Sequence, residues 1–280
     1  MRTLPRPTFS AGDVYQTSIS RVRDSALKKR LENCLSEVVQ DSLDYEIKAS
    51  NAQLHLFPKK SVVNGNVSKL EMEKIYTRRM VPKNSPGRTY YEKLRYPLGN
   101  DKCPFCGQRP SSTLDHYLAK SDYPSLVVSP VNLVPACKDC NFIKSNSFPT
   151  KSEEETLHPY FDNIDDQQWL YGRVNKTNPP SISYYIEAPT NASPILAERV
   201  KYHFQQYELG DLYASEAASE LSDIAFLMDK ILRDAGPQAV KKHLEDIAES
   251  CAKNNKNSWK TALYQALALD SWYCTIGALL

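Results

Sequence analysis

The sequence contains no apolar run that approaches the roughly 20 residues a membrane-spanning helix requires. Its first ten residues, MRTLPRPTFS, lack the apolar stretch of a signal peptide, so we expect a cytoplasmic protein without a membrane segment. Glycine is scarce, with 9 residues in 280, and no internal repeat is present, which excludes collagen-like and solenoid architectures. The length exceeds that of one compact core, so more than one structural unit is expected.

The sequence also lacks a strong net charge, which is only +2, but its charges are unevenly distributed. Residues 1–97 carry 18 basic and 10 acidic side chains, residues 98–151 carry 6 and 4, and residues 152–280 carry 11 and 19. Because clustered cations attract phosphates, the basic first region is the expected nucleic-acid-facing part. The first dozen residues, with Arg2, Pro5, Arg6 and Pro7, predict an extended basic arm that lies along a nucleic acid or a partner.

Helical periodicity dominates both ends of the chain. Apolar residues recur at three- and four-residue intervals over residues 19–49, which predicts one long amphipathic helix. Further helices are expected over residues 68–80, 89–96, 194–207, 212–235, 237–253 and 258–277. The strings WLYGRV and SISYYIEA predict two short strands at the start of the acidic region.

Four of the seven cysteines form two Cys-x-x-Cys pairs, Cys103 with Cys106 and Cys137 with Cys140. Thiolates suit tetrahedral zinc, and two intervening residues let one tight turn present both sulfurs to the same ion. Chance spacing of buried cysteines is the alternative, but both pairs have the correct spacing. We predict a structural zinc, because four sulfurs leave no coordination position for water. The other three cysteines lie in apolar helical patterns and are expected to be buried: Cys34, Cys251 and Cys274.

Residues suited to phosphodiester hydrolysis lie between and just after these cysteine pairs. His116 can take a proton from water at cellular pH, and Asp115 with the Asn141 side-chain oxygen suits Mg²⁺ or Mn²⁺. Lys144 lies one helical turn after Asn141 and could neutralise phosphate charge. Neighbouring residues of a strand point to opposite faces, so Asp115 and His116 cooperate only if they have different tasks or the backbone bends. Asn132 alone would be an ordinary turn residue.

The string LDHYLAKSDYPSLVVSPVNLVPACKDCNFIKS resembles the HNH nuclease motif of the ββα-metal fold, with a match over residues 101–161. The resemblance implies that His116 is the general base, and that Asp115 and Asn141 hold the catalytic divalent ion. Asn132 then tethers the loop that carries the base. Asn141 stands where many members have a metal-binding histidine, which favours weakly held magnesium over tightly bound zinc.

A second histidine follows this motif in the string LHPYFD. His158 is a candidate phosphate contact or metal ligand, although a histidine before proline is more often packed than catalytic. The wider chain is similar to HNH proteins of Septu-type anti-phage systems, which also occur in some retron systems, through LDHYLAKS, NLVPACKDCN, HPYFD and SWKTALYQALALDSWYC. That resemblance implies an ABC- or SMC-like ATPase partner.

Together these features predict an α+β protein, with a small zinc-stabilised ββα-metal HNH module embedded in a mainly helical chain. The predicted regions are a basic arm and helical region (1–97), the nuclease module (98–165) and an acidic, mainly helical region (166–280). The predicted function is metal-dependent cleavage of nucleic acid, DNA more than RNA. Two alternatives remain: a non-catalytic zinc module that binds nucleic acid or protein, and an acidic helical end that serves as an oligomerisation or docking platform.

The predicted module has little charge with which to bind nucleic acid by itself. Four thiolates and one Zn²⁺ reduce the +2 of residues 98–151 to about zero, so affinity must come from the basic first region or from a partner. No base-reading element can be identified, and the sequence therefore does not define a cleavage specificity.

Overall fold

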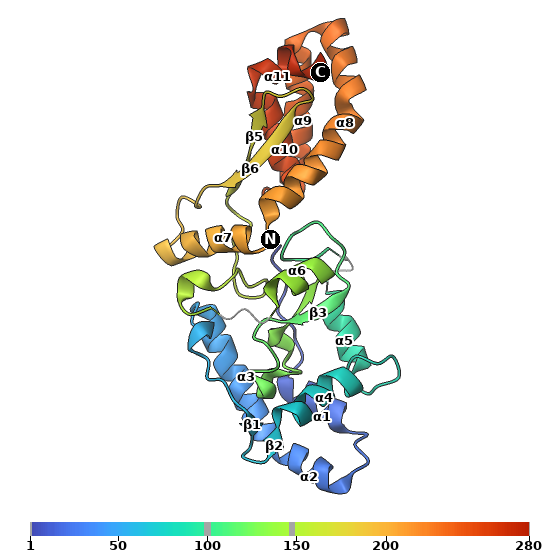
Figure 1. Cartoon of the computed structure of the whole chain (residues 1–280), viewed down its shortest axis with the longest axis vertical. Helices are drawn as coiled ribbons and strands as arrows, with labels where there is room; N and C mark the ends of the chain where they lie inside the picture. Colours follow the sequence, from blue (N-terminus) through green and yellow to red (C-terminus); the bar gives the residue numbers. More distant parts are fainter. Residues whose placement is uncertain (1, 98–101, 146–148, 280) are drawn as a thin grey trace. The chain divides into compact units, whose positions relative to one another are not determined.

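The computed structural model describes residues 2–97, 102–145 and 149–279 (Figure 1). The chain forms two compact units, Met1–Asp162 and Asn163–Leu280, both of them mainly helical with small antiparallel sheets. The predicted regions 1–97 and 98–165 thus lie almost entirely in one unit, and residues 98–101 and 146–148 of the predicted module lie outside the described residues. No helix among the described residues is long and apolar enough to cross a membrane.

The first unit contains helices, short 3-10 turns and two small sheets. The helices are α1 (Ala11–Ile19), α2 (Ser25–Asn33), α3 (Leu35–Ser50), α4 (Lys69–Arg79), α5 (Arg88–Arg95) and α6 (Lys138–Lys144). The strands are β1 (Val62–Val63), β2 (Val67–Ser68), β3 (Thr113–His116) and β4 (Leu133–Ala136), and the 3-10 turns are η1 (Leu54–Leu56), η2 (Pro124–Leu126), η3 (Pro130–Asn132) and η4 (Ser152–Glu154). Strands β1 and β2 pair with each other, as do β3 and β4.

The prediction of one long helix over residues 19–49 was wrong. Ile19 ends α1, and a new helix begins after Asp24, whose carboxylate accepts a hydrogen bond from the Leu27 backbone N–H. A second interruption falls at Cys34, where the backbone N–H bonds to the Leu31 carbonyl three residues back instead of four. Caps of this kind outweigh apolar periodicity because they satisfy backbone groups at helix ends.

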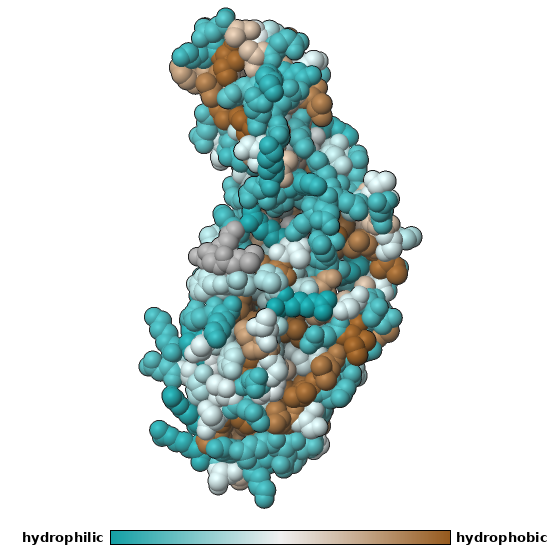
Figure 2. All heavy atoms as spheres, turned by 180° about the vertical axis from the view of Figure 1, so that it is seen from behind, coloured by the Kyte–Doolittle hydropathy of each residue, from teal (hydrophilic) through white to brown (hydrophobic). Residues whose placement is uncertain are grey.

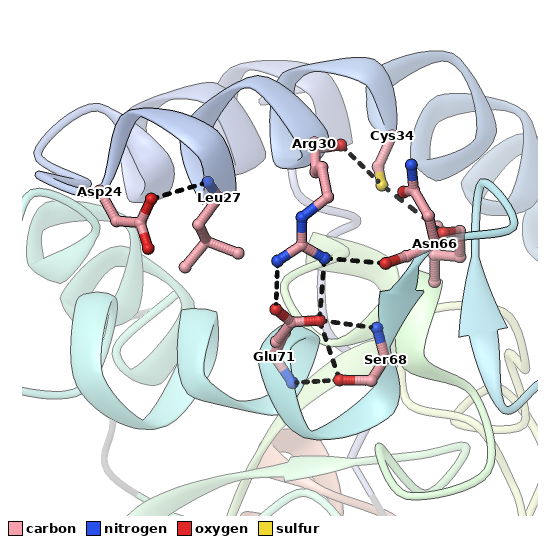
Figure 3. Close-up of polar contacts among 8 residues, drawn as sticks. Asp24, Leu27, Arg30, Cys34, Asn66, Ser68 and Glu71 are labelled. Carbon is pink, nitrogen blue, oxygen red and sulfur yellow. Dashed lines mark hydrogen bonds and ion pairs between the residues drawn. The ribbon is translucent and has the colours of Figure 1, made fainter.

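An ion pair between Arg30 of α2 and Glu71 of α4 joins these two helices, and Ser68 also hydrogen-bonds to Glu71 (Figure 3). The two terminal guanidinium nitrogens of Arg30 donate to the Glu71 carboxylate, Nη2 at 2.6 Å and Nη1 at 3.2 Å. Glu71 is also the third residue of a capping box, because its carboxylate accepts from the Ser68 backbone N–H while the Ser68 hydroxyl accepts from the Glu71 N–H. One carboxylate therefore fixes the start of α4 and its attachment to α2.

A single apolar core connects the N-terminal helices to the β3–β4 sheet. Met72 and Ile75 of α4 belong to the same buried cluster as Leu114 and Leu133 of the two strands. The α4 helix is therefore a packing partner of the strands that carry the candidate site. On helix α3 the side chains of Leu43 and Ile47 are exposed. Figure 2 shows that apolar side chains also gather in a band across the lower part of the face it draws.

The N-terminal arm is extended, but it packs on its own unit. The Arg2 backbone N–H donates to the Pro104 carbonyl at 2.8 Å, and the Arg6 side chain donates to the Tyr160 carbonyl at 3.1 Å. The Arg6 guanidinium also lies over the Phe161 ring, 4.3 Å from its centroid. These contacts hold the extended arm against its own unit, and its contact with a nucleic acid or a partner stays a prediction.

The second unit is a β-hairpin packed with helices. Its strands are β5 (Leu170–Asn175) and β6 (Ser181–Ile186), its helices are α7 (Pro194–Gln206), α8 (Leu209–Ala235), α9 (Pro237–Asn254), α10 (Trp259–Leu269) and α11 (Ser271–Thr275), and it ends with the 3-10 turn η5 (Gly277–Leu279). The two predicted strands are confirmed as an antiparallel pair. The helix predicted over residues 258–277 is divided at Asp270, whose carboxylate caps α11 by accepting from the Tyr273 N–H. Gly172 allows β5 to approach α10, since a Cβ there would lie 2.8 Å from the Ala262 carbonyl oxygen.

Candidate functional site

The four cysteines of the two Cys-x-x-Cys pairs converge on one point. All four are buried, and their sulfur atoms lie within 4.8 Å of one another: Cys103, Cys106, Cys137 and Cys140. Zinc–sulfur bonds of about 2.3 Å separate the sulfurs of a tetrahedral site by roughly 3.8 Å, so small adjustments close this cluster around an ion. Gly107 turns the first knuckle in a left-handed conformation with φ of 67°. The cluster can bind a metal such as zinc.

The second knuckle also starts helix α6, which lies against the small sheet. Cys137 is the N-cap residue, and its sulfur accepts a hydrogen bond from the Cys140 N–H. In the β3–β4 pair, Asp115 lies opposite Val134 and His116 lies opposite Leu133. Strand β3, strand β4 and helix α6 thus follow one another along the chain and carry the candidate residues. The assignment of these elements to the ββα-metal fold stays a prediction.

One open cavity of about 370 Å³ brings three of the predicted site residues together. Asp115 and His116 line it from β3, and Asn141 lines it from α6. Other lining residues include Tyr76 of α4 and Lys120 from the segment after β3. Asp115 and His116 are neighbours in strand β3, and neighbouring residues of a regular strand point to opposite faces. Both nevertheless line this cavity, so they can act in the same site.

His116 is held in a defined protonation state. Its Nε2 lies 2.9 Å from the Val127 carbonyl oxygen, an acceptor only, so Nε2 carries the proton and Nδ1 is the basic nitrogen of the neutral ring. Burial lowers the pKa of His116 to about 3, which keeps the ring neutral at cellular pH. The Tyr76 ring stands edge-on to the imidazole, with centroids 4.4 Å apart, and limits its rotation.

Asn132 is fully buried and joins the two ends of the loop after β3. Its side-chain oxygen accepts from the Leu118 N–H at 2.7 Å, and its amide nitrogen donates to the Leu118 carbonyl at 3.0 Å and the Leu126 carbonyl at 3.3 Å. The Asn132 backbone carbonyl accepts from the Tyr117 N–H. Asn132 therefore fixes the loop that directly follows His116, without lining the cavity itself.

Asp115 is paired with a buried lysine. The Lys144 Nζ lies 3.1 Å from Asp115 Oδ2 and donates a hydrogen bond to the His116 carbonyl at 2.8 Å. Both side chains are about 95% buried. Burial raises the pKa of the Asp115 carboxyl, and the nearby Lys144 cation opposes that shift. Lys144 does not line the cavity, so the structure places it behind the site and not in the position of a phosphate contact.

The donor atoms in the cavity fit a hard divalent cation. Asp115 Oδ2 is buried and lacks a partner with hydrogen-bond geometry, even though Lys144 lies within ion-pair distance. An ionised carboxylate oxygen with an unfilled acceptor position is a ligand of the type Mg²⁺ and Mn²⁺ bind. The Asn141 side chain lines the same cavity and can contribute its amide oxygen. Asp115 and Asn141 are thus the residues that could hold such an ion.

His158 lies in an aromatic cluster instead of this cavity. Its Nε2 is 2.8 Å from the Tyr45 hydroxyl, and its Nδ1 accepts from the Tyr160 backbone N–H at 3.1 Å. The ring packs between Tyr117, at 4.3 Å between centroids, and Phe161, at 4.7 Å. With both nitrogens engaged and 1% of its surface exposed, His158 is placed as a packing residue.

Comparison with known proteins gives one similarity along the whole chain and one partial similarity. The chain is 29% identical to Protein ea31 of Escherichia phage lambda over 290 aligned residues, which cover 96% of this chain and 97% of that protein. It is 33% identical to Septu protein PtuB of Bacillus thuringiensis over 81 residues, which cover 27% of this chain and 31% of PtuB. No protein-family model matches the chain, and no solved structure matches it.

The residues that line the cavity but were not among the sequence-based candidates include Tyr76, Lys120 and Phe142. Tyr76 reaches the site from a helix that begins more than forty residues before β3, and nothing in the local sequence of α4 indicates that role. Lys120 and Phe142 lie inside the motif segment. Their positions in the motif could have indicated them, because Lys120 is a cation four residues after His116 and Phe142 is an aromatic residue directly after Asn141.

Proposed function

We propose that this protein is a metal-dependent endonuclease of the HNH type that hydrolyses phosphodiester bonds in nucleic acid, with DNA favoured over RNA. The carrying observation is the convergence of Asp115, His116 and Asn141 on one cavity, with His116 fixed so that Nδ1 is its basic nitrogen. These residues supply a proton acceptor and oxygen ligands within one recess. A site for binding alone has no need of that combination.

Each residue has a specific task in the proposed reaction. His116 accepts a proton from the attacking water at Nδ1, and the Val127 carbonyl keeps Nε2 protonated meanwhile. Asp115 and Asn141 would hold a Mg²⁺ or Mn²⁺ ion, which would supply Lewis-acid stabilisation of the phosphate and the leaving oxygen. Asn132 holds the loop after His116 in place. Cys137 and Cys140, which would hold a structural zinc, lie at the start of α6, and the bound ion would thereby fix the position of Asn141.

The direct test is cleavage of plasmid DNA and structured RNA in the presence and absence of Mg²⁺ or Mn²⁺. We expect metal-dependent cleavage by the wild type and a loss of at least about 100-fold in His116→Ala, the scale of a lost general base. His243→Ala is the matched control, because His243 lies on α9 in the second unit. Asn141→Ala provides a second variant of the cavity. Full activity in His116→Ala, with correct zinc content, contradicts the proposal, and binding without cleavage favours the non-catalytic zinc module.

The partial similarity to Septu protein PtuB supports a second, separate inference about context. We infer that the chain acts as the nuclease of an anti-phage defence complex with an ABC- or SMC-like ATPase subunit. The test is purification of tagged chain from cells that express its neighbouring genes. Copurification of an ATPase on which cleavage depends supports the inference. A fully active chain that purifies alone contradicts it and leaves the nuclease proposal intact.

A further inference from the structure

Phe142 projects from the wall of the candidate cavity. It lines the cavity next to Asn141. The residue is 83% exposed, the largest exposed fraction among the large hydrophobic residues that the structure describes. A single exposed apolar residue is ordinary on a protein surface. An exposed aromatic ring at the opening of a recess that holds a proton acceptor and carboxylate is in a position to touch substrate.

The position of Phe142 is fixed by the residues around it. Helix α6 starts at Cys137, and Cys140 in its first turn belongs to the metal-binding cluster. Lys144 at its last turn is bonded to the His116 carbonyl. Both ends of this short helix are therefore anchored, so the backbone of Phe142 has a constant place relative to Asp115 and His116. An aromatic side chain with two rotatable bonds on a fixed backbone loses little conformational entropy when it stacks on a ligand.

The reacting groups lie at the bottom of the recess. Asp115 and His116 are both buried, so a phosphate must enter the cavity to meet them. Lys120 lines the same cavity and forms no ion pair with any of the described residues, which makes it available to a phosphate. A strand that places one phosphate in this cavity brings an adjoining base to the level of Phe142.

We propose that the site takes unpaired nucleotides, with the base beside the scissile phosphate stacked on Phe142. This inference rests on the proposed nuclease function and names its substrate class. In a duplex both faces of each base are covered by neighbours, and opening a base step has an energetic cost. In a single strand or a bulge a face is free, and stacking on an aromatic side chain strengthens binding by roughly 5- to 150-fold. Phe142 thus favours single-stranded, bulged or frayed nucleic acid over a continuous duplex.

The test measures affinity and cleavage separately. Binding is measured by fluorescence anisotropy in a His116→Ala background with single-stranded, bulged and fully paired oligonucleotides of one sequence, made as DNA and as RNA. We expect Phe142→Ala to weaken binding of the single strand roughly 5- to 150-fold, with little change for the duplex. Phe142→Trp should keep the preference. The single strand should quench the fluorescence of the added tryptophan. The fluorescence of the three native tryptophans, all at positions 169 and above, is measured in the parent protein and subtracted.

Phe226→Ala is the matched control, because Phe226 is 78% exposed on α8 of the second unit. Retained zinc content and circular dichroism show that each variant is folded. An unchanged affinity in Phe142→Ala, equal losses on both forms, or tighter binding of duplex by the parent protein overturns the inference. Cleavage that depends on His116 but ignores Phe142 overturns it while the nuclease proposal stands. A Phe142-dependent single-strand preference without any cleavage by the wild type overturns the nuclease proposal alone.

Discussion

The amino group of Lys144 lies 3.1 Å from Asp115 Oδ2, and both side chains are buried. This relationship joins the last turn of α6 to strand β3, so the lysine neutralises the carboxylate that is proposed to hold a metal ion. Burial raises the pKa of the Asp115 carboxyl, and the Lys144 cation beside it opposes that shift and favours the ionised form. Lys144 is therefore a positioning residue for Asp115.

Lys144→Met should destabilise the first unit by about 3–5 kcal/mol, because it leaves a buried carboxylate without a counter-charge. The double variant Lys144→Met with Asp115→Asn should recover much of that loss. All three tryptophans lie in the second unit, so the measurement is hydrogen exchange in peptides that cover β3 and β4. Lys138→Met is the control, since Lys138 is exposed on the same helix. Equal effects of the two single variants are incompatible with a specific role of the pair.

Asn132→Ala should loosen the loop after His116. The substitution leaves the Leu118 N–H and carbonyl without their partner, at a cost of about 1–3 kcal/mol for each buried group that finds no water, while the Leu126 carbonyl keeps its bond from the Ser129 N–H. We expect faster exchange of the Leu118 amide and loss of nuclease activity with metal content unchanged. Asn51→Ala removes an exposed asparagine that bonds only to the Ile47 carbonyl, and it should leave both readings unchanged. Protection of Leu118 that survives in Asn132→Ala counts against the tether.

The sequence predicted those features that depend on residues close together in the chain, and it missed those that depend on single hydrogen bonds or on contacts between distant segments. Helices α4 and α7 follow their predicted bounds closely because a capping serine begins each one. The breaks at Cys34 and Asp270 were missed, because apolar periodicity continues through both positions and the decisive hydrogen bonds involve single groups. In the site, motif spacing identified Asp115, His116 and Asn141. Tyr76 could not be found in this way, because only packing of the shared core brings α4 beside β3.

Cys103→Ser should remove the metal from the cysteine cluster and unfold its surroundings. Three remaining sulfurs bind zinc far more weakly, and structural zinc contributes about 10–16 kcal/mol in small domains at neutral pH. Zinc per chain, measured by mass spectrometry, should fall from about one to near zero, with loss of exchange protection in α6. Cys34→Ala is the control, because Cys34 is also buried in the first unit but lies outside the cluster. Loss of zinc in Cys34→Ala, or its retention in Cys103→Ser, contradicts the assigned ligand set.

The Arg30–Glu71 pair should make the stability of the first unit fall in acid. The Arg30 guanidinium, together with the Ser68 backbone N–H, lowers the pKa of Glu71 from 4.5 to about 2. A carboxyl with a depressed folded-state pKa stabilises the fold fully above its unfolded pKa, and that contribution is lost as the pH falls from 4.5 through 2. Glu71→Gln should therefore be less stable than the wild type at pH 7, by about 1 kcal/mol for a partly exposed pair, and the difference should narrow below pH 4.5. Urea unfolding followed by exchange in α2 and α4 measures this, with Glu73→Gln on the same helix as the control. A difference that stays constant from pH 7 down to pH 2.5 would show that the Glu71 charge is not what joins the two helices.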